Sequence, residues 1–279
     1  MKRILVPVDF SETSIYAAKF AAEFSQLVQG ELTLLHILEA PSIGFKPLGK
    51  KDQGDLASLY HQAFIEGVNN RLEELKEELE HKGAEIKILL KQGHAFDFMK
   101  KTMEEVETDL VIMGSKGASG LKEIFIGSNA SRMVRYAECP VIVIKEETHL
   151  SEFTSIVFAT DASIEQDQLS ANVKTVQKLL KLDLHVLKVT TPYSWLEPSQ
   201  VDAQLQRFVD RNRMEEFATH QISADYVDDG AIKFAELNNS GMIIIGTHAR
   251  KGLGHLIGGS ISESIVNESK IPIMVMKLS

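Results

Sequence analysis

The sequence contains one cysteine, Cys139, and no run of apolar residues long enough to cross a membrane. A single cysteine excludes a disulfide within the chain and fits a reducing compartment, so we expect the cytoplasm. A membrane-spanning helix needs about 20 apolar residues, and we therefore expect no membrane partner. The opening MKRILVPVDF has too short an apolar run for a signal peptide and is expected to form a strand.

Positive charge is also scarce, because 30 lysines and arginines stand against 39 aspartates and glutamates, for a formal net charge of −9. A broad nucleic-acid-binding surface needs clustered Lys and Arg, so we expect no nucleic-acid partner. A small anion held at one local site is compatible with this charge. The sequence also lacks a GK[ST] phosphate loop, and we identify no catalytic residues and no metal-ligand set.

The chain repeats one pattern in its two halves. ILVPVDFSETS resembles IVFATDASIEQ, and LVIMGSKGASG resembles IIIGTHARKG. Asp161 follows Asp9 by 152 positions, whereas Gly246 follows Gly114 by only 132. The second copy has therefore lost 20 residues in its middle.

These offsets predict two domains, residues 1–148 and 152–279, on either side of a charged linker at 146–150. Because the segment GAIKFAELNN is brief, we expect the missing residues to shorten the helix between the third and fourth strands of the second domain.

Each half is expected to alternate strands with helices. Ser11 can cap the first helix, which Gly30 ends. The expected strands are continuous apolar runs, typical of a parallel sheet covered on both faces and wound through right-handed crossovers. In the first half they are residues 3–9, 32–38, 85–93, 109–114 and 140–145. We therefore predict an α/β fold made of two doubly wound, five-stranded parallel-sheet domains.

The stretch GSKGASGLKEIFIGSN, residues 114–129, lies between two of these strands. Its glycines let main-chain N–H groups approach an anion, and Gly127 and Ser128 directly precede a helix whose N-terminus favours phosphate. If the first and fourth strands are neighbours, Asp9 and Gly114 face one crevice. The alternatives are that the serine is only a helix cap, that the glycines only form a turn, and that Asp9 only helps Ser11 to cap the first helix.

The spacing Gly114-x2-Gly117-x9-Gly127-Ser128, with Pro7-x-Asp9 and the closing ECPVIVIK, resembles the nucleotide motif of ATP-binding universal stress proteins. The resemblance covers nearly the whole chain, once in each half. It implies a Rossmann-like, flavodoxin-like strand order 3-2-1-4-5 in each domain. It also implies that the fifth strands pair to form an internal pseudo-dimer, and whether two chains then associate as a homodimer is left open.

The resemblance further implies a role for each motif position of the first half. Pro7 and Asp9 would lie at the nucleotide, the main chain at Ile37 would meet adenine, and Met113 and Gly114 would line the ribose and phosphates. The phosphates would be cradled by amides and side chains in the glycine motif, at Gly117, Gly127, Ser128 and Asn129. We expect the amide hydrogens of residues 127–129 to converge on the phosphate chain.

The second half keeps part of the motif. Its matching positions are Asp161, Val189, Gly246, Ala249, Gly259 and Ser260. Ala159 stands where the first half has Pro7, and Ala249 stands where it has Gly117. If that second position needs a left-handed backbone, alanine costs roughly 1–2 kcal/mol there. We therefore expect nucleotide binding mainly in the first half.

Three functions follow as hypotheses. The first is an adenine-nucleotide-binding stress-response or signalling protein that binds ATP, or another adenine nucleotide, with Mg²⁺ able to accompany the phosphates. The second is a slow ATP hydrolase, although we find no base beside the phosphate loop. The third is a nucleotide-free dimeric scaffold, against which the intact first motif argues.

Overall fold

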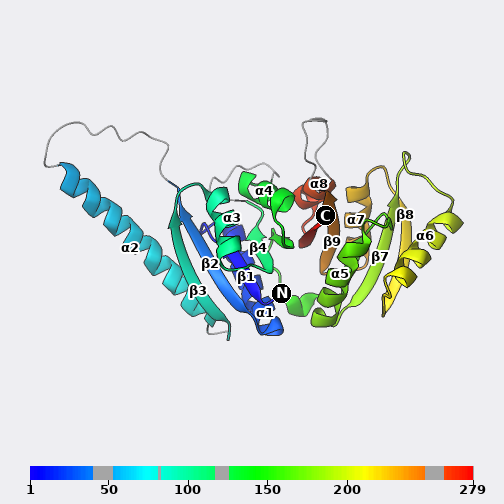
Figure 1. The fold of residues 1–279 in the computed structure, drawn as a ribbon, viewed down its shortest axis with the longest axis horizontal. Helices are drawn as coiled ribbons and strands as arrows, with labels where there is room; N and C mark the ends of the chain where they lie inside the picture. Colours follow the sequence, from blue (N-terminus) through cyan, green and yellow to red (C-terminus); the bar gives the residue numbers. More distant parts are fainter. Residues whose placement is uncertain (40–52, 81–82, 117–125, 249–260, 279) are drawn as a thin grey trace.

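The computed structural model describes residues 1–39, 53–80, 83–116, 126–248 and 261–278. Its described strands form one sheet of ten, in the order β3-β2-β1-β4-β5-β10-β9-β6-β7-β8 (Figure 1). The elements of the first half are β1 (Arg3–Pro7), α1 (Glu12–Val28), β2 (Glu31–Leu38), α2 (Gln53–Glu80), β3 (Glu85–Gln92), α3 (Ala95–Glu105), β4 (Leu110–Gly114), α4 (Ser128–Tyr136) and β5 (Val141–Ile144). Those of the second half are the 3-10 turn η1 (Leu150–Glu152), β6 (Ser155–Ala159), α5 (Asp167–Leu180), β7 (Asp183–Thr190), α6 (Pro198–Arg211), β8 (Phe217–Ser223), α7 (Val227–Leu237), β9 (Met242–His248), α8 (Ile261–Glu268) and β10 (Ile273–Leu278).

The two halves have the same strand order, which confirms the predicted fold. Within each half the paired strands are parallel, and the first strand lies between the second and the fourth. The apolar strand residues alternate between two core clusters, one on each face of the sheet. Helices α1, α2, α5 and α6 cover one face, and α3, α4, α7 and α8 cover the other. This double cover explains why β4 and β5 read as unbroken apolar runs.

The two halves join through their fifth strands, as the resemblance implied. β5 and β10 pair in antiparallel fashion, with Val143 opposite Ile273 and Val141 opposite Val275. All four of these side chains are buried. Because this one pair is antiparallel and the pairs beside it are parallel, the central strands of the two halves point in opposite directions.

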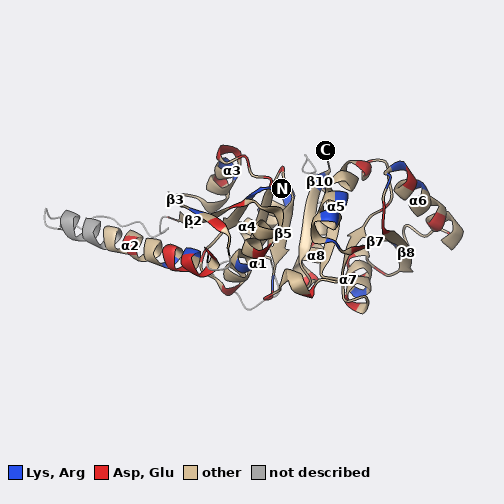
Figure 2. Ribbon diagram, turned by 90° about the horizontal axis from the view of Figure 1, so that it is seen from below, with Lys and Arg blue, Asp and Glu red and all other residues tan. Residues whose placement is uncertain are grey.

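The expected position of the shortening in the second half was wrong. The helices between the third and fourth strands, α3 and α7, each have 11 residues. The difference lies between the second and third strands, where α2 has 28 residues and α6 has 14. The extra length of α2 runs past the edge of the sheet (Figure 1; Figure 2), so it can be lost without uncovering the core. Helices α3 and α7, by contrast, are only about 17 Å long. Shortening either of them would leave part of the sheet uncovered. In the described part of the chain, no helix is both long and apolar enough to cross a membrane.

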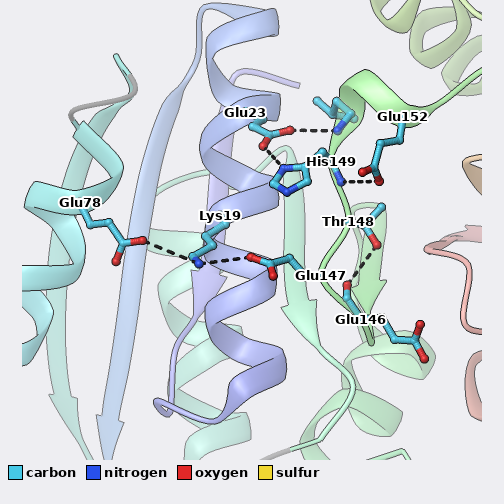
Figure 3. A network of polar contacts seen from close by, with 9 residues as sticks. Lys19, Glu23, Glu78, Glu146, Glu147, Thr148, His149 and Glu152 are labelled. Atoms are coloured by element: carbon cyan, nitrogen blue, oxygen red, sulfur yellow. Dashed lines mark hydrogen bonds and ion pairs between the residues drawn. The ribbon is translucent and has the colours of Figure 1, made fainter.

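The predicted linker packs on α1 through a polar network (Figure 3). Glu23 of α1 receives hydrogen bonds from the linker at both carboxylate oxygens, from His149 Nδ1 at 2.6 Å and from the main-chain N–H of Leu150 at 2.9 Å. Lys19, one turn earlier, lies 3.3 Å from the Glu147 carboxylate. The Glu23 carboxylate raises the pKa of His149. The junction is therefore held by charge as well as by the strand pair.

This geometry predicts a pH-dependent contribution to stability. The folded chain binds the His149 proton more tightly than the unfolded chain, so the stabilisation is present below pH ~6.5, the ordinary histidine pKa, and is lost as the pH rises through the raised pKa. Glu23→Gln keeps an acceptor for Leu150 but removes the charge. We expect this variant to lose less than about 1 kcal/mol, because the pair is partly exposed, and to lose it at pH 5.5 but not at pH 9. Urea unfolding at the two pH values measures this, and an equal loss at both would exclude the ion pair as the cause.

Candidate functional site

The winding of the first half reverses between β1 and β4, which lie side by side, and we call the region beyond their carboxyl ends the first crevice. Ile4 and Leu5 of β1 pair with Leu110 and Val111 of β4, and β2 lies on the other side of β1. In a sheet wound this way, ligands bind beyond the carboxyl ends of the strands at the point where the winding reverses. Five predicted site residues lie at or directly beyond these strand ends, namely Pro7, Asp9, Ile37, Met113 and Gly114.

The side chains of Ile37 and Met113 belong to the core. Met113 is 5 % exposed, and both residues pack in the apolar cluster on the face covered by α3 and α4. What these two positions can offer a ligand is therefore their main-chain N–H and C=O groups. This fits the main-chain contact that the resemblance implied for Ile37.

Asp9 shapes the loop that leads into α1. One of its carboxylate oxygens accepts hydrogen bonds from Ser11 N–H, at 3.0 Å, and from Ser11 Oγ, at 2.6 Å. Phe10 between them has φ 60°, a left-handed conformation. Ser11 is the N-cap and accepts from Ser14 N–H. Asp9 therefore does support the cap at Ser11, as one alternative proposed, and it does so through its Oδ1 atom.

The same loop recurs in the second half. Asp161 accepts from the N–H of Ser163 at 2.9 Å, and Ala162 has φ 61°. The repeat therefore extends to backbone conformation at this point of the fold.

Gly114 has a packing role that the sequence did not reveal. A Cβ atom placed on it would lie 2.6 Å from the main-chain carbon of Thr13 and 2.7 Å from the nitrogen of Ser14. From the same turn, Thr13 Oγ1 donates to the main-chain oxygen of Lys116 at 2.9 Å, and Ser11 Oγ lies 3.2 Å from that oxygen. The first turn of α1 is thereby held against the end of β4.

The start of α4 offers fewer amides than expected. The N–H of Gly127, the N-cap, donates to the main-chain oxygen of Ser115 at 2.7 Å, so it is used within the protein and the expectation for residue 127 was wrong. Ser128 and Asn129 occupy the first turn of α4, where N–H groups have no acceptor within the helix. Ser128 is also exposed. The capacity of this helix end to bind an anion therefore rests on residues 128 and 129.

Two aromatic rings and one guanidinium group pack on one another next to Asp9. The ring of Phe10 lies 5.0 Å from that of His36, and the guanidinium of Arg71 lies 3.9 Å above the Phe10 ring. His36 Nδ1 donates to the main-chain oxygen of Val8 at 2.7 Å, and burial lowers the pKa of its ring. Sequence reasoning missed Arg71, because it sits inside the long helix α2 with no motif around it.

Four predicted site residues lie outside the described residues. They are Gly117 in the first half and Ala249, Gly259 and Ser260 in the second.

The second half contains a cavity where its winding reverses, between β6 and β9. This cavity of about 790 Å³ lies at the corresponding strand ends, and Asp161, Val189 and Gly246 line it together. Much of the rest of its wall is apolar, with Trp195 and Ile265 among the contributors, and Arg207 also lines it.

A late helix start distinguishes this crevice from the first one. In register with the first half, α5 would begin at Ile164, but it begins at Asp167. Gln166 lies in the unwound turn and is 8 % exposed, and its Oε1 has no hydrogen-bond partner among the described residues. A Cβ atom on Gly246 would lie 3.0 Å from that oxygen. A side chain thus occupies the place that the backbone of α1 fills in the first half.

Lys188 replaces His36 in the second crevice. Its Nζ donates to the main-chain oxygen of Asp161 at 2.6 Å and to Gln204 Oε1 at 2.7 Å. Burial lowers the pKa of this ammonium group. The second crevice therefore places a cation at a position where the first has an aromatic ring.

Cys139 carries an unactivated thiol, and the described residues contain no cluster of metal-ligating side chains. Burial raises the pKa of the Cys139 thiol to about 12, which leaves little of the reactive thiolate at neutral pH. Within residues that the structure describes, no group of three or more His, Cys, Asp or Glu side chains could hold a metal ion.

Comparison with known proteins gives matches in both halves. The model of the universal stress protein family matches residues 1–145 and 152–277. Universal stress protein MJ0577 of Methanocaldococcus jannaschii is 31% identical over 156 residues, which cover 52% of this chain and 96% of that protein. Universal stress protein Rv2005c of Mycobacterium tuberculosis is 24% identical over 291 residues and matches 99% of this chain and 97% of its own length. The crystal structure of a universal stress protein from Archaeoglobus fulgidus superimposes with a TM-score of 0.78 at 22% identity, over 99% of this chain and 98% of that one.

The two strand-end glycines provide a matched pair for mutation. Gly114→Ala forces a methyl group into the main chain of α1, and we expect it to destabilise the chain by about 1–3 kcal/mol, as overpacking does. Gly246→Ala meets the ends of the Leu169 and Gln166 side chains, which can move, so we expect less than about 1 kcal/mol. Urea unfolding followed by circular dichroism compares them. An equal or larger loss for Gly246→Ala would contradict the packing role assigned to Gly114.

Proposed function

Because this chain belongs to the universal stress protein family, whose model matches both of its halves, we propose that it binds an adenine nucleotide, with ATP as the ligand of its first half. The function is binding rather than catalysis, in a stress-response or signalling role. The observation that carries the proposal is that β1 and β4 are neighbours, with Asp9 directly beyond β1 and the N-cap of α4 tied to Ser115 directly beyond β4. An acceptor for hydroxyl groups and a helix end that favours anions are what a ribose phosphate requires.

The first crevice would hold the nucleotide as follows. The carboxylate of Asp9 accepts from the ribose hydroxyls while remaining bonded to Ser11. The main chain at Ile37 meets adenine. The N–H groups of Ser128 and Asn129, with the Ser128 hydroxyl, donate to phosphate oxygens, and the motif assigns Gly117 to the same task. Pro7, Met113, Gly114 and Gly127 shape the pocket.

The second crevice is proposed as the weaker site for a triphosphate. Asp161, Val189 and Gly246 repeat the first half, and Ala249, Gly259 and Ser260 complete the motif in sequence. Ala249 replaces a glycine, however, and the late start of α5 changes what lies beside Gly246. The cavity itself is roomy enough for a ligand of nucleotide size.

Catalysis is the second candidate. Hydrolysis needs a group that positions the attacking water and a metal clamp. Mg²⁺ would enter on the phosphate oxygens of the nucleotide, because the described residues include no group of three metal-ligating side chains. Slow ATP hydrolysis therefore stays an alternative, as does a nucleotide-free scaffold.

The remaining parts of the proposal concern organisation. We propose domain limits at 1–148 and 152–279, a cytoplasmic location on the grounds of the single cysteine, and no nucleic-acid partner. The internal pseudo-dimer leaves room for a further step, in which two chains associate as a homodimer.

Binding can be tested on the purified chain without any mutation. A ligand that binds only the folded state at 100 times its Kd stabilises that state by about 2.7 kcal/mol. We expect millimolar ATP to raise the melting temperature by several degrees, and protein purified without added nucleotide to release an adenine nucleotide on denaturation. Absence of both effects would favour the scaffold. Phosphate release with and without Mg²⁺, abolished by a crevice variant that still binds ATP, would favour the hydrolase.

The emphasis on the first half has its own test. Gly127→Val places a branched side chain directly before the first turn of α4, and we expect it to remove most of the ATP affinity while the far-ultraviolet circular dichroism stays unchanged. The matched variant Gly259→Val should cost at most a few-fold in affinity. Titration calorimetry measures both, and equal losses would indicate that the two halves bind alike.

A further inference from the structure

Helices α4 and α8 lie side by side across the junction of the two halves (Figure 1). In the sequence, each helix comes directly after the glycine motif of its own half. Because β5 and β10 are antiparallel, the two helices run in opposite directions. The last turn of α8 therefore meets the first turn of α4, which is the turn that the proposed function assigns to phosphate.

Asn267, in the last turn of α8, holds the residue that leads into α4. Its Oδ1 accepts a hydrogen bond from the main-chain N–H of Ile126 at 2.7 Å. The next amide, that of Gly127, donates to Ser115 O in the first half. Lys145, which follows β5, donates to the main-chain oxygen of Asn267. The approach to α4 is thus fixed from both halves at consecutive residues.

Glu263, one turn earlier in α8, holds the body of α4. Its Oε1 accepts from Ser131 Oγ at 3.2 Å and from Arg135 Nε and Nη2 at 3.0 and 2.6 Å. The Glu263 side chain is only 12 % exposed, so these contacts lie largely out of water. Glu263 and Asn267 are four residues apart, as are Ser131 and Arg135, which places each pair on one face of its helix.

These contacts are unequal between the halves. In the internal repeat, Glu263 corresponds to Ser131 and Asn267 corresponds to Arg135, each with an offset of 132. The first half therefore supplies donors and the second half supplies acceptors. Among the described residues, these contacts position α4, which is the helix that follows the complete glycine motif of the first half.

We propose that Asn267 and Glu263 are positioning residues for the phosphate site of the first half, so that this site is complete only when the second half is docked on it. The inference rests on the proposed function. Neither side chain is assigned a contact with the ligand. They act by fixing where the amides of Ser128 and Asn129 point, and a preorganised donor costs less to order when the ligand binds.

The test uses the full chain and titration calorimetry with two probes. ATP reports on base, ribose and phosphates, and adenosine lacks the phosphates. We expect Asn267→Ala to lower the affinity for ATP about tenfold, the upper range for one hydrogen bond, and to change that for adenosine by less than about twofold. Glu263→Gln keeps an acceptor for Ser131 but loses the ion pair, and we expect a loss of about threefold for ATP alone.

Glu138→Gln is the matched control. It breaks another ion pair between the halves, from Glu138 to Lys277 at 2.5 Å. Glu138 follows the last turn of α4 and not the turn assigned to phosphate, so this variant should leave ATP binding unchanged. The inference is overturned if both Asn267→Ala and Glu263→Gln bind ATP like the wild type, or if they weaken ATP and adenosine equally. A wild-type chain that binds neither probe would overturn the proposed function and this inference with it, which is a distinguishable result.

Discussion

The antiparallel pairing of β5 with β10 is the constraint on which the rest of the structure depends. A five-stranded parallel sheet ends in a strand whose outer N–H and C=O groups lack partners, and here both end strands are also strongly apolar. Pairing them satisfies the backbone and buries the side chains in one step. Because the pairing reverses direction, the carboxyl ends of the strands in the two halves point to opposite sides of one continuous sheet. The same reversal brings the end of α8 to the beginning of α4.

Much of this arrangement could be predicted from the sequence. The strands and their parallel winding followed from continuous apolar runs that alternate with helices, because those patterns depend on local periodicity and on a short list of allowed crossovers. Ser11 as a cap followed in the same way. The strand order that places β1 beside β4 came from the resemblance and is confirmed. What failed depended on contacts between segments that are distant in sequence. The place of Gly114 against Thr13, the use of the Gly127 amide by Ser115, and the stacking of Arg71 on Phe10 have no signal in spacing.

The second half shows how a repeat can keep its pattern and change its site. Asp161 and Ala162 reproduce the turn of Asp9 and Phe10, so the sequence likeness was a reliable guide there. Four residues after Ala162 the copies differ, because Gln166 stands where the first half has Ser14 and the helix begins only after it. One lost turn removes the backbone that would pack on Gly246. A motif search scores the glycine as retained, although its neighbours have changed.

This divergence bears on why a tandem chain would keep two unequal copies. In a symmetric pair, each helix after a glycine loop would hold the other through the same residues, and neither site could change alone. Here Glu263 and Asn267 accept while Ser131 and Arg135 donate, so the roles of α4 and α8 are distinct. Helix α8 borders the second crevice through Ile261 and Ile265 and reaches the entrance of α4 through Asn267. The residues that line the second crevice can therefore change while the face of α8 that contacts α4 is retained.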